Sequence, residues 1–316
     1  MIPKTRPWLW IGLLTAVCCV IFALEILVGR AGWPTGPLLG LRLTRALIAV
    51  MVGAGLAVSG AALQALFHNP LADPYVLGTA SGGALGYAVG LFAGLNSLAS
   101  LFWPSVVGST GFLLAVFWLS KHNGRLISSR MLLAGVMAGF FASAGVAVLM
   151  ILARQNTLRT FYVLWGNIGV VISPGDIPGL VVAGIGVVVC AAWLVSLSKP
   201  LDALSLGEAE AGAMGVDVEK LKIGVFLASG IIVGLSVAVV GAVGFVGLMV
   251  PHFIRKAISP RHAPLLVGSF VGGAGLVLAS DLFLRVIGFY QLPVGVLTSL
   301  MGVPFFLYIM RRSSWS

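Results

Sequence analysis

Long runs of apolar residues, separated by short polar stretches and helix breakers, follow one another along nearly the whole chain. A helix of roughly 20 apolar residues crosses the about 30 Å of hydrocarbon in a bilayer. The pattern therefore predicts about ten membrane-spanning helices, several of them short and interrupted by glycine, with 243–254 the weakest as a full span. The predicted spans are 8–28, 43–67, 77–94, 99–120, 131–153, 177–197, 223–241, 243–254, 264–284 and 294–310.

The composition supports a membrane protein. Of the 316 residues, 59% are hydrophobic and only 9% are charged, and the mean hydropathy is +1.09. Soluble domains carry about 25% charged residues, so a water-exposed surface cannot be made from this composition. The 42 glycines also fit a membrane bundle, because small residues let helices approach closely. We expect one all-α transmembrane domain over residues 1–316.

The basic residues predict the orientation. With the N-terminus in the cytoplasm, 13 of the 19 Lys and Arg residues fall on the cytoplasmic side, which agrees with the positive-inside rule. An even number of spans then places both termini in the cytoplasm. The net charge of +10 is explained by this bias, so it requires no nucleic-acid partner.

Several kinds of chemistry lack a motif in this chain. There is no G-x-x-x-x-G-K-[ST] loop for ATP and no H-E-x-x-H zinc motif. The acids Glu25 and Asp281 lie near the outer ends of their spans, whereas ion-coupled carriers usually place carboxylates near the midplane. This weighs against a secondary transporter, and no residues are candidates for a catalytic set. The three cysteines, Cys18, Cys19 and Cys190, lie within predicted spans and suit core packing.

One polar stretch, "FHNPLADPYVLG" at 67–78, separates two apolar runs. Pro70 and Pro74 prevent a continuous helix through it. Irregular backbone near membrane depth is tolerated where it is buried in protein or lines a water-filled cavity. A turn is expected here. The preceding run, "GAGLAVSGAALQALF", carries small and polar residues that lipid would not favour, so the turn could also line a pathway.

These residues resemble the FecCD-type permeases, the membrane subunits of bacterial ABC importers for iron–siderophores, haem and cobalamin. The resemblance runs nearly end to end. One departure is Thr44, where the family commonly has proline, and we expect threonine to loosen the turn at this position slightly. The stretches that carry it are "LRLTRALIAVMVGAGLAVSGAALQALFHNPLADPYVLGTASGGALG" (41–86), "SSRMLLAGV" (128–136), "LDALSLGEAEAGAMGVDVEKLK" (201–222), "GAVGFVGLMVPHFIRK" (241–256) and "LPVGVLTSLMGVPFFLYIM" (292–310).

The resemblance implies a type II ABC importer permease with inverted five-helix repeats, located in the bacterial inner membrane. It implies a homodimer with the substrate path along its axis, two separate ATP-binding subunits on the cytoplasmic face, and a periplasmic or lipoprotein substrate-binding protein. The chain itself would bind no cofactor, because ATP and Mg are used by the partner ATPase. A weak echo between "GLAVSGA" (55–61) and "GLSVAVVGA" (234–242) fits inverted repeats.

The resemblance also implies roles for particular residues. Asn69 and Leu71 match an inner constriction, and Ser128 and Ser129 match a cytoplasmic gate. Residues 198–222 form the expected cytoplasmic loop, in which a short helix between Gly207 and Gly215, with Glu208 and Glu210, would dock on the ATPase. The three arginines of the stretches "LRLTR" and "DLFLR" would receive carboxylates of the binding protein. They are Arg42, Arg45 and Arg285.

The arginines also suit simpler roles. They could be span-end anchors, and Arg285 could form a helical ion pair with Asp281, which precedes it by four residues. We expect the cargo to be an iron–siderophore or haem, with cobalamin as the alternative. A stand-alone secondary transporter or channel of the same hydropathy is the rival from another class.

Overall fold

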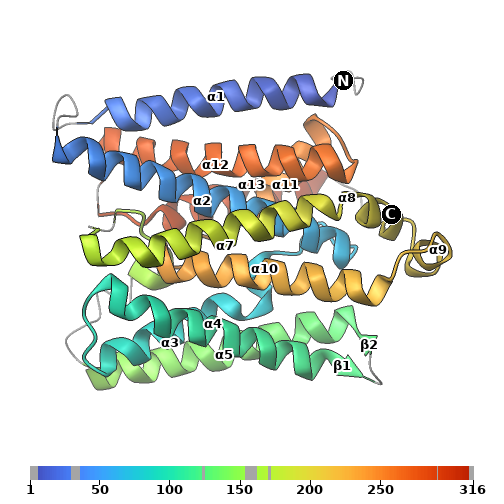
Figure 1. The fold of residues 1–316 in the computed structure, drawn as a ribbon, viewed down its shortest axis with the longest axis horizontal. Coiled ribbons are helices and arrows are strands. Elements are labelled where there is room, and N and C mark those ends of the chain that lie inside the picture. Colours follow the sequence, from blue (N-terminus) through green and yellow to red (C-terminus); the bar gives the residue numbers. More distant parts are fainter. Residues whose placement is uncertain are drawn as a thin grey trace.

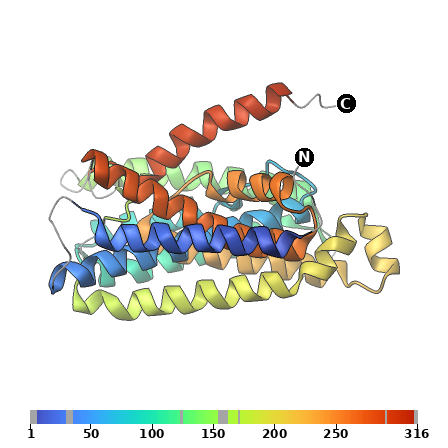
Figure 2. The ribbon, with the colours of Figure 1, turned by 90° about the horizontal axis from the view of Figure 1, so that it is seen from above.

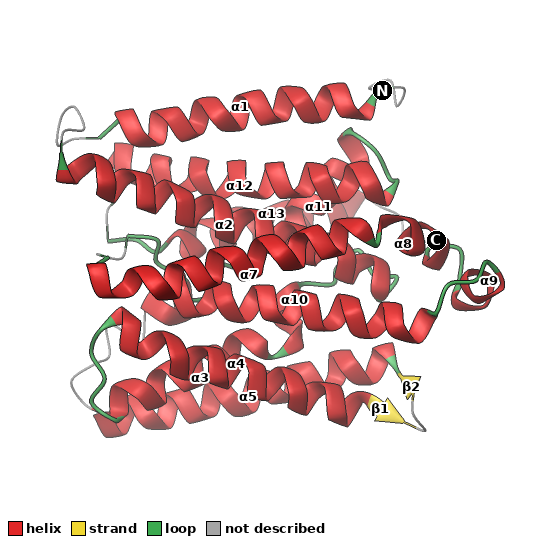
Figure 3. Ribbon diagram, in the orientation of Figure 1, coloured by secondary structure: helices red, strands yellow, loops and turns green. Residues whose placement is uncertain are grey.

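The computed structural model of the chain describes residues 6–29, 36–122, 125–153, 162–169, 172–289 and 291–312. Helices make up nearly all of this part of the chain, and most of the long ones lie side by side with their axes roughly parallel or antiparallel (Figures 1 and 3), whereas the last helix slants away from the bundle (Figure 2). The longer helices are α1 (Pro7–Leu27), α2 (Pro37–Leu66), α3 (Thr79–Phe92), α4 (Leu98–Ser120), α5 (Ser128–Ala153), α7 (Ile177–Ser196), α10 (Val218–Val240), α11 (Val246–Ala257), α12 (His262–Ile287) and α13 (Val294–Arg312).

These helices correspond one by one to the ten predicted spans. Among the described residues, seven helices are long and apolar enough to cross a membrane, and residues 294–305 of α13 form a shorter apolar helix. The other two, α3 and α11, have 14 and 12 residues and are short for a full span. The prediction that 243–254 is a weak span agrees with the shortness of α11.

The predicted start of the second span is wrong. Helix α2 begins at Pro37 rather than at residue 43, so Arg42, Thr44 and Arg45 all lie within its first turns. The turn expected near Thr44 is replaced by helix, and the Thr44 hydroxyl donates a hydrogen bond to the Gly40 carbonyl, 2.9 Å away. Helix α2 begins with a proline, which suits the first helical position because the N–H group of that residue has no acceptor within the helix and proline lacks this group.

The short elements include two 3-10 turns, η1 (Pro74–Leu77) and η2 (Pro174–Asp176), which precede α3 and α7. Helices α8 (Ser198–Leu204) and α9 (Glu208–Ala213) project past the ends of the long helices (Figures 1 and 2). A small antiparallel hairpin, β1 (Lys121–His122) and β2 (Arg125–Leu126), lies at the same end, which we call the α9 end. Helix α1 starts and α13 stops at this end, as an even number of spans requires.

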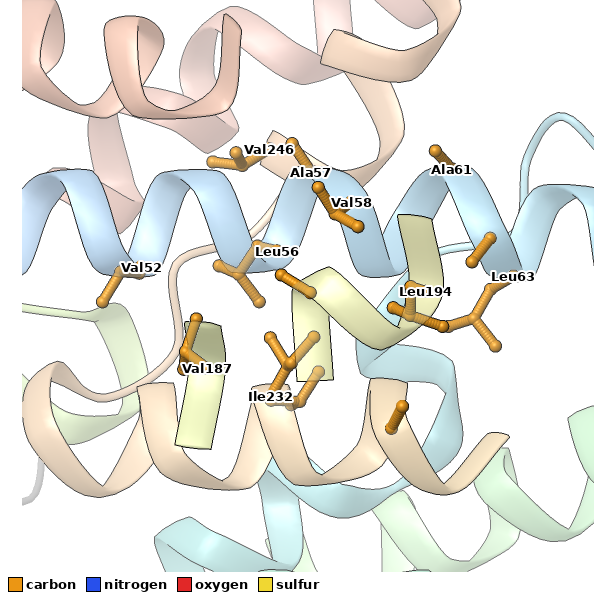
Figure 4. Packing of buried hydrophobic residues seen from close by; sticks show 14 of the residues in the cluster. Val52, Leu56, Ala57, Val58, Ala61, Leu63, Val187, Leu194, Ile232 and Val246 are labelled. Carbon is orange, nitrogen blue, oxygen red and sulfur yellow. The ribbon is translucent and has the colours of Figure 1, made fainter. Parts of the chain in front are cut away.

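Helices α2 and α10 form the centre of the bundle. In their most apolar 18-residue windows, 83% of α2 and 78% of α10 is buried, against 11% of α1. Figure 4 shows Leu56 of α2 packing with Val187 of α7 and Ile232 of α10, and each is at most 1% exposed. A side chain at Gly55 would collide with Val187 and Ile232, so the three helices meet closely only because this residue is glycine.

Each of the two central helices packs against a pair of helices in the same way. Helix α2 packs on α11 and α12, which also contact each other, and α10 packs on α3 and α4, which also contact each other. The echoed stretches 55–61 and 234–242 lie in α2 and at the end of α10, which run in opposite directions. This correspondence explains the echo, because each central helix needs small residues where two neighbours approach it.

The chain breaks that follow the two central helices interlock. The Tyr75 hydroxyl of η1 accepts a hydrogen bond from the Val243 N–H, 2.7 Å away, in the connection between α10 and α11. The amide of Gln64, near the end of α2, donates to the Gly247 and Leu248 carbonyls, each at 3.4 Å. Buried irregular backbone therefore finds partners in the other half of the chain, as a low-dielectric environment demands.

A substitution at Gly60 tests the close packing of α2 on α11. A Cβ atom at Gly60 would fall on the Gly247 carbonyl, which is backbone and cannot rotate away. We expect Gly60→Ala to lower the free energy of unfolding by about 1–3 kcal/mol, because the helices must separate. Gly111 of α4 is the control, since no atom lies near its Cβ position and alanine is the better helix former. Thermal unfolding in detergent measures both, and equal midpoints would contradict the packing argument.

The polar connection after α2 also predicts a pH effect. The Asp73 carboxylate accepts the Tyr75 N–H at 2.8 Å and caps η1, and burial raises the pKa of Asp73 to about 6. The folded protein then binds this proton more tightly than the unfolded chain, so stability falls as the pH rises from about 4 to about 6 and stays lower above that.

Asp73→Asn keeps an oxygen acceptor for the Tyr75 N–H and removes the charge. We expect the variant to be more stable than the parent at pH 8, by on the order of 2 kcal/mol, and to lose most of this advantage at pH 4.5. Unfolding midpoints at the two pH values measure the difference. An advantage of the same size at both would show that Asp73 is not protonated in the folded protein.

Candidate functional site

The predicted inner constriction lies in the connection after α2. The Asn69 N–H donates to the Gln64 carbonyl at 3.1 Å, and the Asn69 side-chain oxygen accepts the Leu71 N–H at 2.9 Å. Both Asn69 and Leu71 are half-buried. His68 has a positive φ of 48°, which reverses the chain direction at the end of the helix. Asn69 and Leu71 are thus held on a turn with defined backbone geometry.

The predicted gate serines lie at the first turn of α5, at the α9 end. Ser128 is half-buried and Ser129 is exposed. Both line an open cleft of about 760 Å³ together with Glu208 and Ala209 of α9 and the first turn of α10. Asn69 and Leu71 do not line this cleft, although η1, a few residues after them, packs on α5. Within one chain the structure therefore places the serines beside the predicted coupling helix.

The predicted coupling loop contains the expected short helix, but its last residues, from Val218 on, already belong to α10. Helix α9 starts after Gly207, whose φ of +132° suits glycine, and is followed by Gly215 with a φ of +86°. A side chain at position 207 would also collide with the Glu210 carboxylate, which lies over that glycine. The two glycines thus bound a short, sharply turned helix whose Ala211 is buried and whose remaining side chains are exposed.

The loop is tied to three helix ends of the bundle. The exposed His68 after α2 places its ring Nε2 2.8 Å from the Leu204 carbonyl of α8. The Asp202 carboxylate of α8 accepts the His262 N–H at 2.9 Å, at the start of α12, and lies 2.7 Å from the His262 Nδ1. These two contacts anchor α8, and the third anchors α9.

The third contact is an ion pair between Glu208 of α9 and Lys222 of α10. The Lys222 Nζ atom lies 2.7 Å from a Glu208 carboxylate oxygen and 3.4 Å from the Leu126 carbonyl of β2. The Leu126 N–H donates to the Glu219 carboxylate at 2.8 Å, so both backbone groups of Leu126 are held by α10. Lys222 is only 5% exposed, which is unusual for lysine and requires such partners.

The three predicted docking arginines lie at the end of the bundle opposite α9, where α1 ends, α2 begins and α12 ends (Figure 1). Arg45 holds Asp281 with two hydrogen bonds of 2.6 Å each. Arg285 contacts the Glu25 carboxylate at 2.7 Å and donates to the Glu25 carbonyl at 2.5 Å. Its helical pairing with Asp281 is looser, at 3.9 Å. We call these four residues and Arg42 the outer arginine cluster.

The arginines of this cluster differ in accessibility. Arg42 and Arg285 are 5% and 6% exposed, and Arg42 donates to the Ile26 and Leu27 carbonyls at 3.0 and 3.2 Å, near the end of α1. The Arg45 side chain is 21% exposed. The side chains of Glu25 and Asp281 are fully buried, so the cluster pairs its acids inside the protein. The bidentate fork of Arg45 is the geometry in which arginine binds carboxylates most strongly.

Two residues of the coupling region, Glu219 and Lys222, are not found by reasoning from the sequence. In the sequence they are only charges of a cytoplasmic loop, whereas in the structure they lie in the first turns of α10. Their spacing of three residues places them on one helix face, which is the available signal. Their common partner lies on β2, and the sequence signal for that hairpin is the dipeptide Asn123-Gly124 between the two strands, which is typical of two-residue hairpin turns.

The chain is similar to known transport proteins over most of its length. The model of the FecCD transport family matches residues 11–312. The hemin transport system permease protein HmuU of Yersinia pestis is 40% identical over 283 residues, which cover 87% of this chain and 83% of that protein. The vitamin B12 import system permease protein BtuC of Vibrio vulnificus is 35% identical over 311 residues, covering 94% and 92%.

A solved structure has the same fold. It is an inward-facing conformation of a metal-chelate type ABC transporter, and it matches with a TM-score of 0.86 and 30% identity. The match covers 96% of this chain and 98% of the other. The chain therefore belongs to the FecCD transport family and has the fold of a type II ABC-transporter permease.

Proposed function

We propose that the chain is the permease of an ATP-driven importer for haem or a ferric chelate. Two observations favour this cargo: the relative that transports hemin is 40% identical, and the vitamin B12 permeases are 34–36% identical. Cobalamin import is the second candidate, supported by those same permeases. Two copies of the chain would form the path, two separate ATPase subunits would bind at the α9 end, and a binding protein would deliver the cargo at the outer arginine cluster.

The observation that carries the proposal is the shape and surface of the α9 end. Helix α9 projects past the membrane helices (Figure 2), and its flanking residues Leu206 and Met214 are 66% and 64% exposed. Apolar side chains beyond the lipid-facing length of the bundle have no bilayer to cover them, so a protein partner is the natural cover. Together with Glu210, they form a small knob suited to insert into a cleft of an ATPase.

The proposal that two copies pair is based on the exposed apolar face of α5. Helix α5 begins at the gate serines, and only 17% of its most apolar window is buried within the chain. Its exposed side chains include Phe140 and Phe141, at 69% and 74%. A second copy covering this face would bring two sets of gate serines toward one axis, and the remaining apolar surface would meet lipid.

Transport by the reconstituted system tests the proposal. Proteoliposomes containing the permease and its ATPase, supplied with the binding protein, should take up hemin or a ferric siderophore only when ATP is present. Uptake of cobalamin in preference to both would support the second candidate. Uptake by the permease alone, driven by an ion gradient, would instead support a secondary transporter.

Substitutions on the knob test the docking of the ATPase. Glu210→Lys and Met214→Ser should each weaken the affinity of the permease for the ATPase by about tenfold, since single residues at the centre of an interface carry more than about 1 kcal/mol. Lys220→Glu is the control, because Lys220 is exposed at the same end but pairs with Asp217 away from the knob. Affinity is measured by titrating the ATPase onto the purified permease. Unchanged affinity in both knob variants would place the docking surface elsewhere.

Arg45 and Arg285 should respond differently to loss of charge. Arg45→Gln should weaken docking of the binding protein by about tenfold and reduce its salt dependence, because the accessible charge of the cluster is lost. It should also lower the free energy of unfolding, because among the described residues the buried Asp281 keeps only Arg285, at 3.9 Å, as an ion-pair partner. Arg285→Gln should chiefly lower the free energy of unfolding, by about 3–5 kcal/mol, since it leaves the buried Glu25 without its partner.

Binding titrations at low and high salt, with unfolding midpoints for each variant, separate the two effects. If Arg45→Gln binds like the parent protein at low salt, the arginines only hold the helix ends together and the binding protein docks on another surface.

A further inference from the structure

We propose that Lys222 is the positioning residue that links the ATPase-docking knob to the cytoplasmic gate. This inference rests on the proposed function, because it takes α9 as the knob and the first turn of α5 as the gate. It adds a residue to which neither the family resemblance nor the similarity to known permeases assigned a role. Three elements, α9, β2 and α10, meet at this one ammonium group.

Lys222 is buried in a place where a lysine is costly. A buried charge needs partners that replace its hydration, and removing a partner is strongly unfavourable. The partners here come from two different elements, namely the Glu208 carboxylate of α9, the preceding helix, at 2.7 Å and the Leu126 carbonyl of β2 at 3.4 Å. The ammonium therefore bridges α9 and β2 while its stem remains part of α10.

The β2 side of this bridge leads directly to the gate. Leu126 is 2% exposed, and its N–H is held by Glu219, so the strand residue cannot shift without moving the first turns of α10. Ser128 follows two residues later and starts α5. A displacement of Leu126 thus reaches the gate through one intervening residue, without any flexible linker.

The α9 side of the bridge faces the ATPase. Glu208 is 53% exposed at its side chain, so its carboxylate pairs with Lys222 at the edge of the knob rather than deep in the core. The open cleft of about 760 Å³ between α9, the gate serines and α10 leaves room for α9 to move relative to α5. Both members of the ion pair line this cleft, whereas the contacts of His68 and His262 tie only α8.

These contacts give Lys222 a role different from that of the knob residues. When the ATPase subunits move α9, the Glu208 carboxylate either draws the Lys222 ammonium along or breaks contact with it. In both cases the hydrogen bond from Lys222 to the Leu126 carbonyl changes. The variant Lys222→Met keeps most of the side-chain volume and cuts the bridge. The ATPase should then still bind and hydrolyse ATP, while the gate no longer responds.

The test uses disulfide crosslinking between two copies of the chain. In a background without the three native cysteines, Ser129→Cys reports the distance between gates in the reconstituted complex, with and without a non-hydrolysable ATP analogue. In the parent, the crosslinking yield should change several-fold between these states. In Lys222→Met the ratio should fall to about one, and hemin uptake should drop by about tenfold or more, the size expected when a charge-assisted hydrogen bond is lost.

Two variants control for indirect effects. Lys220→Met removes an 85% exposed lysine from the same helical turn and should behave like the parent. Lys222→Arg retains a donor that can reach both partners and should restore most of the response. If Lys222→Met cannot be purified as a folded protein, Glu208→Ala removes the carboxylate from the exposed side of the same bridge and must show the same loss of response.

The outcomes separate this inference from the proposed function. A normal nucleotide response in Lys222→Met or in Glu208→Ala would overturn the link, while failure of the Glu210→Lys variant to bind the ATPase would still support the knob. Loss of ATPase binding in Lys222→Met would also overturn it, because the residue would then act in docking. A parent protein whose crosslinking never responds to nucleotide would overturn the gate and the link together.

Discussion

The hydrocarbon solvent is the constraint on which the rest of this structure depends. Lipid offers no hydrogen bonds, so every backbone group at membrane depth must find a partner within the protein. Continuous helices meet this demand locally. Where the chain breaks after α10, Tyr75 of η1 and Gln64 of α2 supply partners for the Val243 N–H and for the Gly247 and Leu248 carbonyls. The interlocking of the two breaks is thus a consequence of the solvent rather than an independent feature.

The same solvent explains why charges fasten the helix ends. Lipid tails are as apolar as leucine, so burial of apolar side chains does not hold membrane helices together, and close packing and polar contacts take its place. In the middle of the bundle, glycines such as Gly53 and Gly60 allow backbone to meet backbone. At the two ends, ion pairs hold the elements together: Glu25 with Arg285 and Asp281 with Arg45 on one side, and Glu208 with Lys222 on the other.

The sequence predicts the features that depend on local pattern. Ten apolar helices and the short helix between Gly207 and Gly215 follow from composition and spacing, and the structure confirms them. The predicted start of α2 is wrong, because the charged residues in 42–45 resemble the edge of a span. In the structure these arginines lie in the helix and turn to partners on α1 and α12, which no local pattern reveals. The roles of the gate and docking residues stay predictions, since they concern a second copy and partner proteins.

The distribution of contacts around the projecting loop bears on how motion could pass through a rigid bundle. Interiors as tightly packed as the α2–α10 centre do not deform continuously, so a movement imposed at one end is transmitted by shifts of whole elements. Helix α8 is fixed to two helix ends by His68 and His262, and it can serve as the stationary side of such a movement. Helix α9 is separated from α8 by glycine and is held to the bundle by an ion pair that lines an open cleft. The loop thus combines a fixed half and a movable half, and the movable half is the one linked to the strand that leads into α5.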